Sequence, residues 1–363
     1  GGMGTGYEAL QARPKRRVAS KVLRSDIASQ RTIDRFVREG EVLARLDHPG
    51  VARVFETGRA MGEDGRGRPF ITMQFVEHAA AITSFVQDRD LSDEDRIKLM
   101  VEVCEADHYG HQRGIIHRDI KPNNLLVGTD GTPRIIDFGV ARTADAEDTR
   151  AANDTIAHVI LVTLRYMSPE QCAGRANEVD VRTDVYALGV VLYEVLLGHL
   201  PYDFTTDSLI DIPRDIVEHA PLSPSRRLHS DLQAIVYKAL EKHPDDRYPS
   251  AEALASDLRR FLSGEPIEAK RDRAWYVLTK TLRRYRRTVS LVASTFVVLC
   301  GIAVWLGLMY VRAERDAMDL RRLDYLQTIA LAERELESSR TGELRRLLES
   351  CPAQRTDGFT SMQ

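Results

Sequence analysis

The stretch from residue 114 to residue 139 decides the fold. It contains Gly114-Ile-Ile-His117-Arg118-Asp119-Ile-Lys121-Pro-Asn-Asn124, then the apolar run Leu125-Leu-Val127, a Thr129-Asp-Gly131-Thr turn, and Arg134-Ile-Ile-Asp137-Phe138-Gly139. The alternation of apolar runs with turn residues predicts short strands flanked by polar loops. The order and spacing of the polar residues in these loops carry the functional signal, because no one of them is informative alone.

Upstream of this stretch, the sequence predicts a small β-rich lobe with one helix. The strands are expected over residues 18–21, 51–55 and 70–75, and the helix over residues 32–46. Alternation along the first strand places Lys21 on its inner face, where a lysine needs an anion. The helix, which Pro49 prevents from continuing, offers Glu39 as that anion. Taken alone, Glu39 is also typical of a surface carboxylate.

The chain opens with Gly1-Gly2-Met3-Gly4, which we expect to lie between two strands. Where side chains are absent, backbone N–H groups can close over phosphates. A glycine-rich start is equally typical of a flexible chain end, so this motif alone does not decide. We expect the chain to be a piece of a longer protein, because a motif is already in progress at its first residue.

Downstream, a helix over residues 97–111 leads into the deciding stretch, and here the chain resembles the protein kinase family. His117-Arg118-Asp119, with Asn124 five residues after the Asp, and Asp137-Phe138-Gly139 match that family's catalytic loop and metal-binding motif in residue type and spacing. The resemblance implies an α+β, bilobal protein-kinase-like fold. Residues 1–77 would form an N-lobe truncated in its glycine-rich loop, and residues 78–265 a helical C-lobe.

The resemblance continues beyond the deciding stretch. Ser168-Pro169-Glu170 resembles the end of an activation segment, and Asp184 resembles the residue that supports the catalytic loop. Arg247 resembles the family's partner for Glu170. Arg118 beside Asp119 suggests activation by a phosphate on the segment between residues 137 and 170. The candidate acceptors are Thr149 and Thr155, although this segment is also typical of a mobile loop.

The resemblance implies how ATP would be held. Lys21, oriented by Glu39, is expected to contact the α- and β-phosphates, with Gly1, Gly2 and Gly4 closing over them. Met73 falls at the family's gatekeeper position. The hinge whose backbone pairs with adenine would be Gln74-Phe75-Val76.

The resemblance also implies the residues of phosphoryl transfer, which requires positioning and charge neutralisation rather than covalent chemistry. Asp137 and Asn124 are expected to bind Mg²⁺, which prefers carboxylate and amide oxygens. Asp119 is expected to accept the hydroxyl proton. Lys121 is expected to lie beside the γ-phosphate and to mark Ser/Thr specificity, and Thr163 to contact Asp119.

Two further expectations concern the interior and the departures from the family pattern. His117 and Phe138 are expected to pack with Leu43 and Val54 as an internal spine rather than to do chemistry. The departures are Gly6 where the family has the Val that covers adenine, Ser20 before Lys21, Asp107 on an apolar stripe, and Val162 before Thr163. None removes a group that does chemistry, but together they suggest a tuned or damaged copy.

The implied function is phosphorylation of Ser/Thr hydroxyls in proteins, using ATP and Mg²⁺, with autophosphorylation included. The chain is thus expected to be a protein serine/threonine kinase similar to the bacterial, membrane-anchored members of the family. The alternative is a pseudokinase receptor or scaffold that binds nucleotide or a partner without turnover. The presence of Lys21, Glu39, Asp119, Asn124 and Asp137 favours the enzyme.

Residues 288–311 carry no charge and are mostly apolar, long enough to cross a hydrocarbon core of roughly 30 Å. The basic residues of segment 266–287 predict that the kinase part is cytoplasmic and that the chain crosses the inner membrane once. That segment would lie at the headgroups or form a solvated linker. Residues 312–363 would begin an extracytoplasmic helical region, with one helix over residues 316–336 and another over residues 343–349. Members of such a family are commonly activated as dimers, so a homodimer is a further expectation.

Composition excludes other classes. The formal charge of −3, from 51 Lys+Arg and 54 Asp+Glu, argues against a dedicated nucleic-acid binder. The four Cys residues are far apart in sequence, which suggests neither a zinc site nor a disulfide framework.

Overall fold

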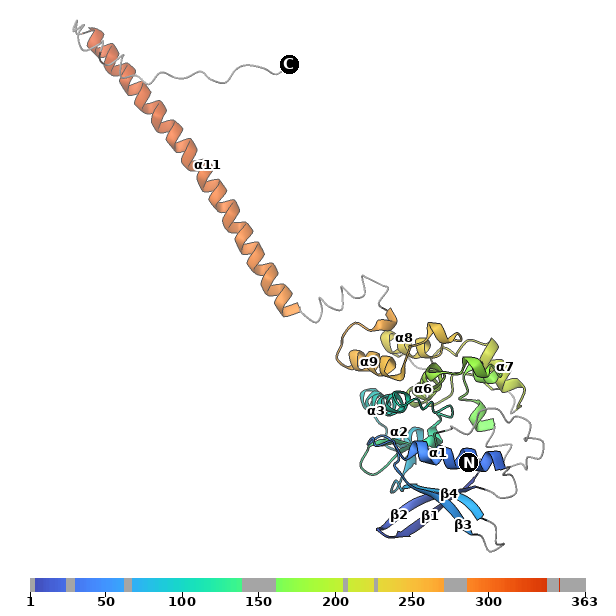
Figure 1. Ribbon diagram of the computed structural model, residues 1–363. Helices are drawn as coiled ribbons and strands as arrows, with labels where there is room; N and C mark the ends of the chain where they lie inside the picture. The colour runs from blue at the N-terminus through green and yellow to red at the C-terminus, as the bar shows by residue number, and fades with distance from the viewer. Residues whose placement is uncertain are drawn as a thin grey trace. The chain divides into compact units, whose positions relative to one another are not determined.

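The computed structural model describes residues 4–23, 30–61, 67–138, 161–204, 208–224, 228–270, 286–337 and 346. The chain forms two units, Gly1–Arg284 and Tyr285–Gln363. The first unit combines a small sheet with a larger group of helices (Figure 1). The α+β, bilobal arrangement expected from the sequence is therefore confirmed.

A four-stranded antiparallel sheet forms the N-terminal lobe. Its strands are β1 (Gly4–Ala12), β2 (Lys15–Leu23), β3 (Val54–Met61) and β4 (Gly67–Gln74), in the order β1-β2-β4-β3. Helix α1 (Gln30–Leu43) packs against β3 and β4. This close approach requires a glycine, because a Cβ on Gly40 would lie 2.3 Å from Cγ2 of Thr57.

Most boundaries in this lobe differ from the expected ones by a few residues, and two of the differences involve the link to the second lobe. Strand β3 begins at Val54, and Val51 instead forms an isolated parallel bridge with Ile135 of the other lobe. Helix α1 ends at Leu43, and the next residues continue as hydrogen-bonded turns up to Leu46. The late start of β3 follows from these contacts, because residues 50–52 pair with Ile135 of the second lobe before the chain enters the sheet.

The C-terminal lobe is mainly helical. Its small sheet has the order β5 (Ala80–Ala81), β6 (Leu125–Val127), β7 (Pro133–Ile135). Its helices are α2 (Ile82–Asp88), α3 (Asp93–His111), α5 (Pro169–Cys172), α6 (Val181–Leu197), α7 (Asp211–Glu218), α8 (Ser230–Ala239) and α9 (Ala251–Leu262). Short 3₁₀ turns are η1 (Pro122–Asn124), η4 (Ala176–Glu178), η5 (Pro244–Asp246) and η6 (Glu268–Lys270).

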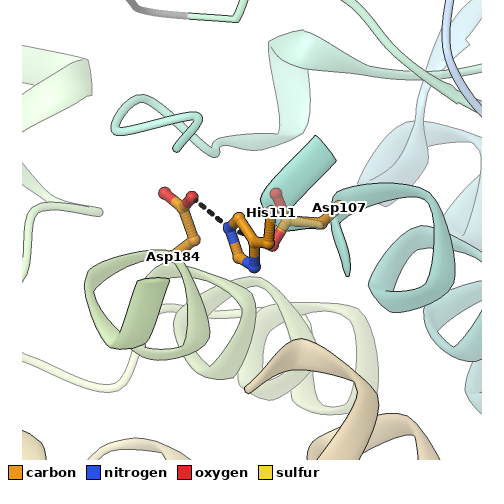
Figure 2. A group of neighbouring side chains, drawn as sticks. All are labelled: Asp107, His111 and Asp184. Carbon is orange, nitrogen blue, oxygen red and sulfur yellow. Dashed lines mark hydrogen bonds and ion pairs between the residues drawn. The ribbon is translucent and has the colours of Figure 1, made fainter. Parts of the chain in front are cut away.

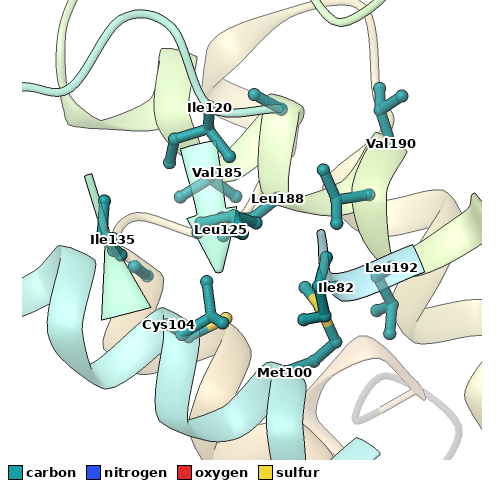
Figure 3. Close-up of a cluster of buried hydrophobic side chains, with 14 of the residues drawn as sticks. Ile82, Met100, Cys104, Ile120, Leu125, Ile135, Val185, Leu188, Val190 and Leu192 are labelled. Carbon is teal, nitrogen blue, oxygen red and sulfur yellow. The ribbon is translucent and has the colours of Figure 1, made fainter. Parts of the chain in front are cut away.

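Helix α6 is the centre of this lobe. It is apolar on nearly all sides, which is the pattern of a fully buried helix, and thirteen of its residues are buried. Figure 3 shows Val185, Leu188 and Leu192 of α6 packed beside Cys104 and Met100 of α3. The helix begins at the cap Asp180 and ends at Gly198, whose φ of 79° suits glycine. This rigid core supports the loops at the N-terminal end of α6.

Helix α3 begins four residues earlier than the sequence analysis placed it. Oγ of Ser92 accepts a hydrogen bond from N of Asp95 at 3.2 Å, and acidic residues fill the first turn. Both features stabilise a helix N-terminus. The helix therefore extends beyond its apolar stripe.

The second unit contains one long helix, α11 (Arg286–Glu337), of 52 residues. Ala293–Arg334 within it is long and apolar enough to cross a membrane by length and composition. The sequence analysis separated a span over residues 288–311 from a following helix over residues 316–336, whereas the structure joins them. No proline interrupts residues 286–337, so nothing in the sequence stops the helix between the two. The helix expected over residues 343–349 lies almost entirely outside the described residues.

Candidate active site

The carboxylate of Asp184 on α6 binds the main chain of the loop that follows α3. Oδ2 of Asp184 accepts a hydrogen bond from N of His117, and Oδ1 accepts one from N of Arg118, both at 2.7 Å. Arg118 has a φ of 61°, a left-handed conformation that costs energy for a residue with a side chain. Because two charge-assisted hydrogen bonds hold that conformation, the role expected for Asp184 as the support of this loop is confirmed.

Asp119, Lys121, Asn124 and Thr163 form one hydrogen-bonded cluster. Nζ of Lys121 lies 3.0 Å from Oδ2 of Asp119 and donates to Oγ1 of Thr163 at 2.8 Å. Nδ2 of Asn124 donates to the main-chain oxygen of Asp119 at 2.8 Å and to its Oδ2 at 3.2 Å. Thr163, expected to contact Asp119, is thus linked to it through the ammonium group of Lys121.

Asp137 follows strand β7 and has a φ of 53°. Its Oδ2 is 3.0 Å from Nζ of Lys21, which reaches it from β2. Both side chains are about one quarter exposed, at 27% and 25%. Glu39 lies on α1, but its side chain is outside the described part of the structure, so its predicted pairing with Lys21 stays a prediction.

The donor atoms fit a hard cation. Asp137 offers a carboxylate, and because the amide nitrogen of Asn124 is used for Asp119, its amide oxygen is the atom suited to a metal. Oxygen donors of this kind are the ligands of Mg²⁺. The assignment of Asn124 and Asp137 to a magnesium ion is therefore chemically consistent with this arrangement.

His117 and Phe138 belong to the interior. Their ring centroids are 4.7 Å apart, and both side chains are buried. Burial lowers the pKa of His117, which keeps its imidazole neutral. Phe138, Leu43 and Val54 line one pocket together with Lys21 and Asp137. Of the residues expected in the spine, His117 and Phe138 are in ring contact, and Phe138 lines the same pocket as Leu43 and Val54.

The residues expected at the nucleotide are only partly described. Gly1 and Gly2, like Gly139, lie outside the described residues, and Gly4 begins β1. Gln74 ends β4, where its N–H donates to the oxygen of Arg53 at 2.8 Å, and Val76 follows in the connecting loop. A Cβ on Gly6 would meet nothing within 4 Å, so a larger residue there would fit.

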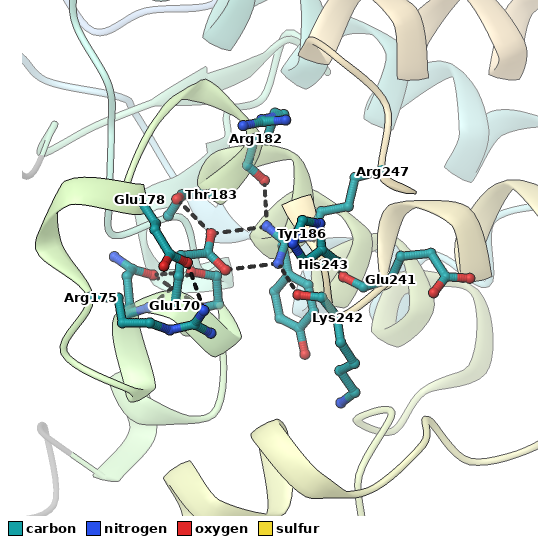
Figure 4. A network of polar contacts seen from close by, with 12 residues as sticks. Glu170, Arg175, Glu178, Arg182, Thr183, Tyr186, Glu241, Lys242, His243 and Arg247 are labelled. Atoms are coloured by element: carbon teal, nitrogen blue, oxygen red, sulfur yellow. Dashed lines mark hydrogen bonds and ion pairs between the residues drawn. The ribbon is translucent and has the colours of Figure 1, made fainter. Parts of the chain in front are cut away.

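Glu170 and Arg247 form a buried ion pair. Nη1 and Nη2 of Arg247 donate to Oε1 and Oε2 of Glu170 at 2.9 and 2.8 Å, and Oγ1 of Thr183 donates to Oε1 at 2.8 Å. Arg247 also donates to the main-chain oxygens of Arg182, Glu241 and Lys242 (Figure 4). The predicted partnership of Glu170 with Arg247 is confirmed.

Arg247 stabilises the ionised form of Glu170. Burial would raise the pKa of Glu170, but the hydrogen bonds and the positive charge of Arg247 outweigh burial and hold this pKa below its usual range. Glu170 is therefore ionised at neutral pH. Through its hydrogen bonds the ion pair links α5, α6 and the residue that follows η5.

The sequence analysis missed one contact to the loop that carries Asp119. Gln171 donates through Nε2 to the oxygen of Arg118 at 2.9 Å, and it also completes a capping box with Ser168 at the start of α5. The Ser-x-x-Gln spacing is a visible sequence signal for the cap. Nothing in the spacing shows the contact to Arg118. Thr149 and Thr155, the candidate phosphate acceptors, lie outside the described residues.

Known proteins are similar to this chain in sequence. A model of the protein kinase domain matches residues 1–258 of the chain. The chain is 39% identical over 273 residues to the serine/threonine-protein kinase PknB of Mycobacterium tuberculosis, an alignment that covers 74% of the chain and 42% of the relative. It is 36% identical over 273 residues to a probable serine/threonine-protein kinase of Streptomyces coelicolor, covering 74% of the chain and 39% of that relative. The chain thus spans about two fifths of the length of these curated relatives.

Proposed function

The chain belongs to the protein kinase family, and from this premise we propose that it transfers the γ-phosphate of ATP to serine and threonine hydroxyls of proteins. The observation that carries the proposal is the position of Lys121. Its ammonium group bridges Asp119 and Thr163, two residues 44 positions apart in sequence, in the loop where the hydroxyl would be received. The names of the similar bacterial relatives support Ser/Thr specificity.

Each residue of the cluster has a task in this reaction. The carboxylate of Asp119 accepts the proton of the attacking hydroxyl, and Asn124 and Lys121 fix its orientation. Lys121 also offers positive charge to the transferred phosphoryl group, whose transition state spreads negative charge over its oxygens. Lys21 holds the phosphates of ATP from β2. Mg²⁺, held by Asp137 and Asn124, supplies neutralisation of phosphate charge when it is bound.

Lys21 and Asp137 form an ion pair, with 3.0 Å between Nζ of Lys21 and Oδ2 of Asp137. The pair places the residue proposed to hold the phosphates beside the residue proposed to hold the metal. In this proposal Lys21 serves nucleotide positioning and not proton transfer.

The test is phosphate incorporation from labelled ATP with Mg²⁺ into the full chain in detergent and into a generic basic protein, with the phosphoamino acids identified. Incorporation on Ser and Thr is expected for the wild type. Lys21→Met should lower it by about 100-fold, because a fixed charge at the phosphates is lost. Lys98→Met, an exposed lysine on α3, should keep wild-type activity.

Binding of nucleotide by the folded chain without any transfer would contradict the proposal. That outcome would identify the chain as a pseudokinase receptor or scaffold. Incorporation of phosphate into the chain itself, absent in Lys21→Met, would establish autophosphorylation.

We further propose that α11 anchors the chain in a bacterial inner membrane. Its apolar residues, including Phe296, Leu299 and Trp305, are exposed within their own unit, as expected for side chains that face lipid. A charged residue at the centre of a spanning helix costs about 2.5 to 3.5 kcal/mol in insertion. The wild type should therefore stay in the membrane fraction after alkaline extraction, and Val298→Arg/Leu299→Arg should be released.

Leu323→Arg/Leu326→Arg is the matched control for this experiment, since both positions follow the uncharged segment. It should remain in the membrane fraction. Release of the wild type by alkali, without detergent, would contradict membrane anchoring.

A further inference from the structure

Asp107 is a buried carboxyl that the proposed reaction does not use. It lies on α3, one turn before His111, among the buried apolar residues Val103, Cys104 and Ala106. Its relative exposure is 0%, and neither of its oxygens has a hydrogen-bond partner among the residues that the structure describes. Because burying a carboxyl without hydrogen bonds is costly, this residue needs a compensating interaction.

His111 connects Asp107 to the catalytic loop. Nε2 of His111 lies 2.8 Å from Oδ2 of Asp184 and 3.3 Å from Oδ2 of Asp107. Figure 2 shows the imidazole between the two carboxyl groups, one from α6 and one from α3. The same oxygen of Asp184 accepts the N–H of His117. Asp107 is thus linked to the loop that carries Asp119 through two side chains.

The charges around this cluster favour a bound proton. Burial raises the pKa of Asp107, and the negative charge of Asp184 raises it further. Burial alone would lower the pKa of His111, but Asp107, Asp184 and Asp180 at the start of α6 outweigh it, so this pKa is raised. From the loop side the cluster faces His117, whose pKa is lowered. The imidazole of His111 is therefore flanked by the carboxyl groups of Asp107, Asp184 and Asp180, while the imidazole on the loop side is neutral.

A metal ion is the other occupant that these three side chains could hold, since their ligand atoms lie within 4.8 Å of one another. Asp184, however, already uses both oxygens for main-chain N–H groups, and its Oδ2 also receives His111. An ion would have to displace the imidazole from Asp184. A proton held by the pair, on the carboxyl group of Asp107 or on the imidazole of His111, leaves the Nε2–H of His111 free to donate to Asp184 and keeps both main-chain hydrogen bonds in place.

We propose that Asp107 is a positioning residue for the catalytic loop: it shares one proton with His111, and this proton keeps Asp184 in place beneath the loop. The inference rests on the proposed kinase function. When the proton leaves at alkaline pH, two carboxylates face each other across a neutral imidazole, and the support of the loop weakens. A neutral residue at position 107 needs no such proton.

The sign of the pH dependence follows from the raised pKa values. A group whose pKa is higher in the folded than in the unfolded state stabilises the fold below its unfolded pKa and loses this contribution as pH rises through its folded pKa. For His111 the unfolded value is 6.5. Wild-type stability and loop order should therefore both decline on the alkaline side of that value.

The test compares the full chain in detergent with Asp107→Asn and Asp107→Leu, between about pH 6 and about pH 9, measuring kcat, KM for ATP and the midpoint of thermal unfolding. At the acidic end kcat should agree within about twofold. At the alkaline end wild-type kcat should fall about fivefold relative to both variants, with KM for ATP unchanged. The wild-type midpoint should fall in parallel. Glu102→Gln, an exposed carboxyl on α3, should follow the wild type.

Three results would overturn the inference. One is the same pH profile for wild type and both variants. Another is a wild-type midpoint that does not fall with pH, which decides the matter even if the variants do not fold or no phosphate is transferred. The third is one equivalent of metal in the purified chain, with chelation lowering the midpoint of the wild type but not of Asp107→Leu. Absence of all transfer would contradict the proposed function, and the midpoints would still test Asp107.

Discussion

Replacing Asp119 by Asn is expected to lower kcat by about 10²- to 10⁴-fold while KM for ATP changes little. The amide cannot accept the proton of the attacking hydroxyl, and positioned proton transfer contributes a factor of this size. The substitution keeps the shape of the side chain, and Lys121 and Asn124 still contact its position from two sides. The fold should therefore survive, with a midpoint of thermal unfolding close to that of the wild type. Single-turnover and steady-state kinetics of labelled phosphate transfer give the measurement.

Asp203→Asn is the matched control, because Asp203 is exposed and lies on a loop of the helical lobe. It should transfer phosphate at the wild-type rate. A residual kcat above about one tenth of wild type in Asp119→Asn would remove Asp119 from the role of proton acceptor. A rise in KM for ATP of the same size as the loss in kcat/KM would point instead to a role in nucleotide binding.

Replacing Arg247 by Ala is expected to lower the free energy of unfolding by about 3 to 5 kcal/mol, because it leaves the buried carboxylate of Glu170 without its partner. The two side chains are 0% and 1% exposed, so solvent does not screen the lost charge. Three main-chain oxygens lose a donor as well. The midpoint of thermal unfolding should fall by roughly 10 °C, and Glu170→Gln should fall less because those three hydrogen bonds remain.

The matched control is Arg259→Ala, which removes an exposed pair with Glu105 and Glu252 and should cost less than about 1 kcal/mol. Acid provides a second check. The pKa of Glu170 is lowered from 4.5, so its ion pair stabilises the fold above that pH and loses this contribution as pH falls through the folded value. The gap between wild type and Arg247→Ala should narrow in that range. Equal costs for Arg247→Ala and Arg259→Ala would contradict the assigned importance of the buried pair.

Much of the fold could be predicted because apolar periodicity, turn residues and caps such as Asp180 act locally in sequence. The site residues Asp119, Asn124 and Asp137 could be named because they stand in short, local motifs that resemble those of a known family. The partnership of Glu170 with Arg247, 77 residues apart, came only from the family resemblance and not from spacing. A pairing across such a distance is fixed by packing, which one sequence does not display.

Asp107 shows where sequence reasoning ended. Its place on an apolar stripe identified it as a departure, but its neighbour Asp184 is far away in sequence and is brought close only by the packing of α3 on α6. The early start of β3 expected at Val51 failed for a related reason. Val51 has strand-forming character, but its one bridge is to Ile135 in the other lobe, and a tertiary contact determined its pairing.

The continuity of α11 has a mechanical consequence. At about 1.5 Å per residue, its 52 residues make a rod of about 78 Å, more than twice the roughly 30 Å of a hydrocarbon core. Every interior peptide unit is hydrogen-bonded to the next turn, and no proline supplies a hinge. A kinked helix would absorb a rotation applied at one end, whereas a continuous helix transmits that rotation to its other end. Inserting one residue into such a helix rotates the part that follows by about 100° relative to the part that precedes it. The relative orientation of the two helix ends can therefore be changed in single-residue steps.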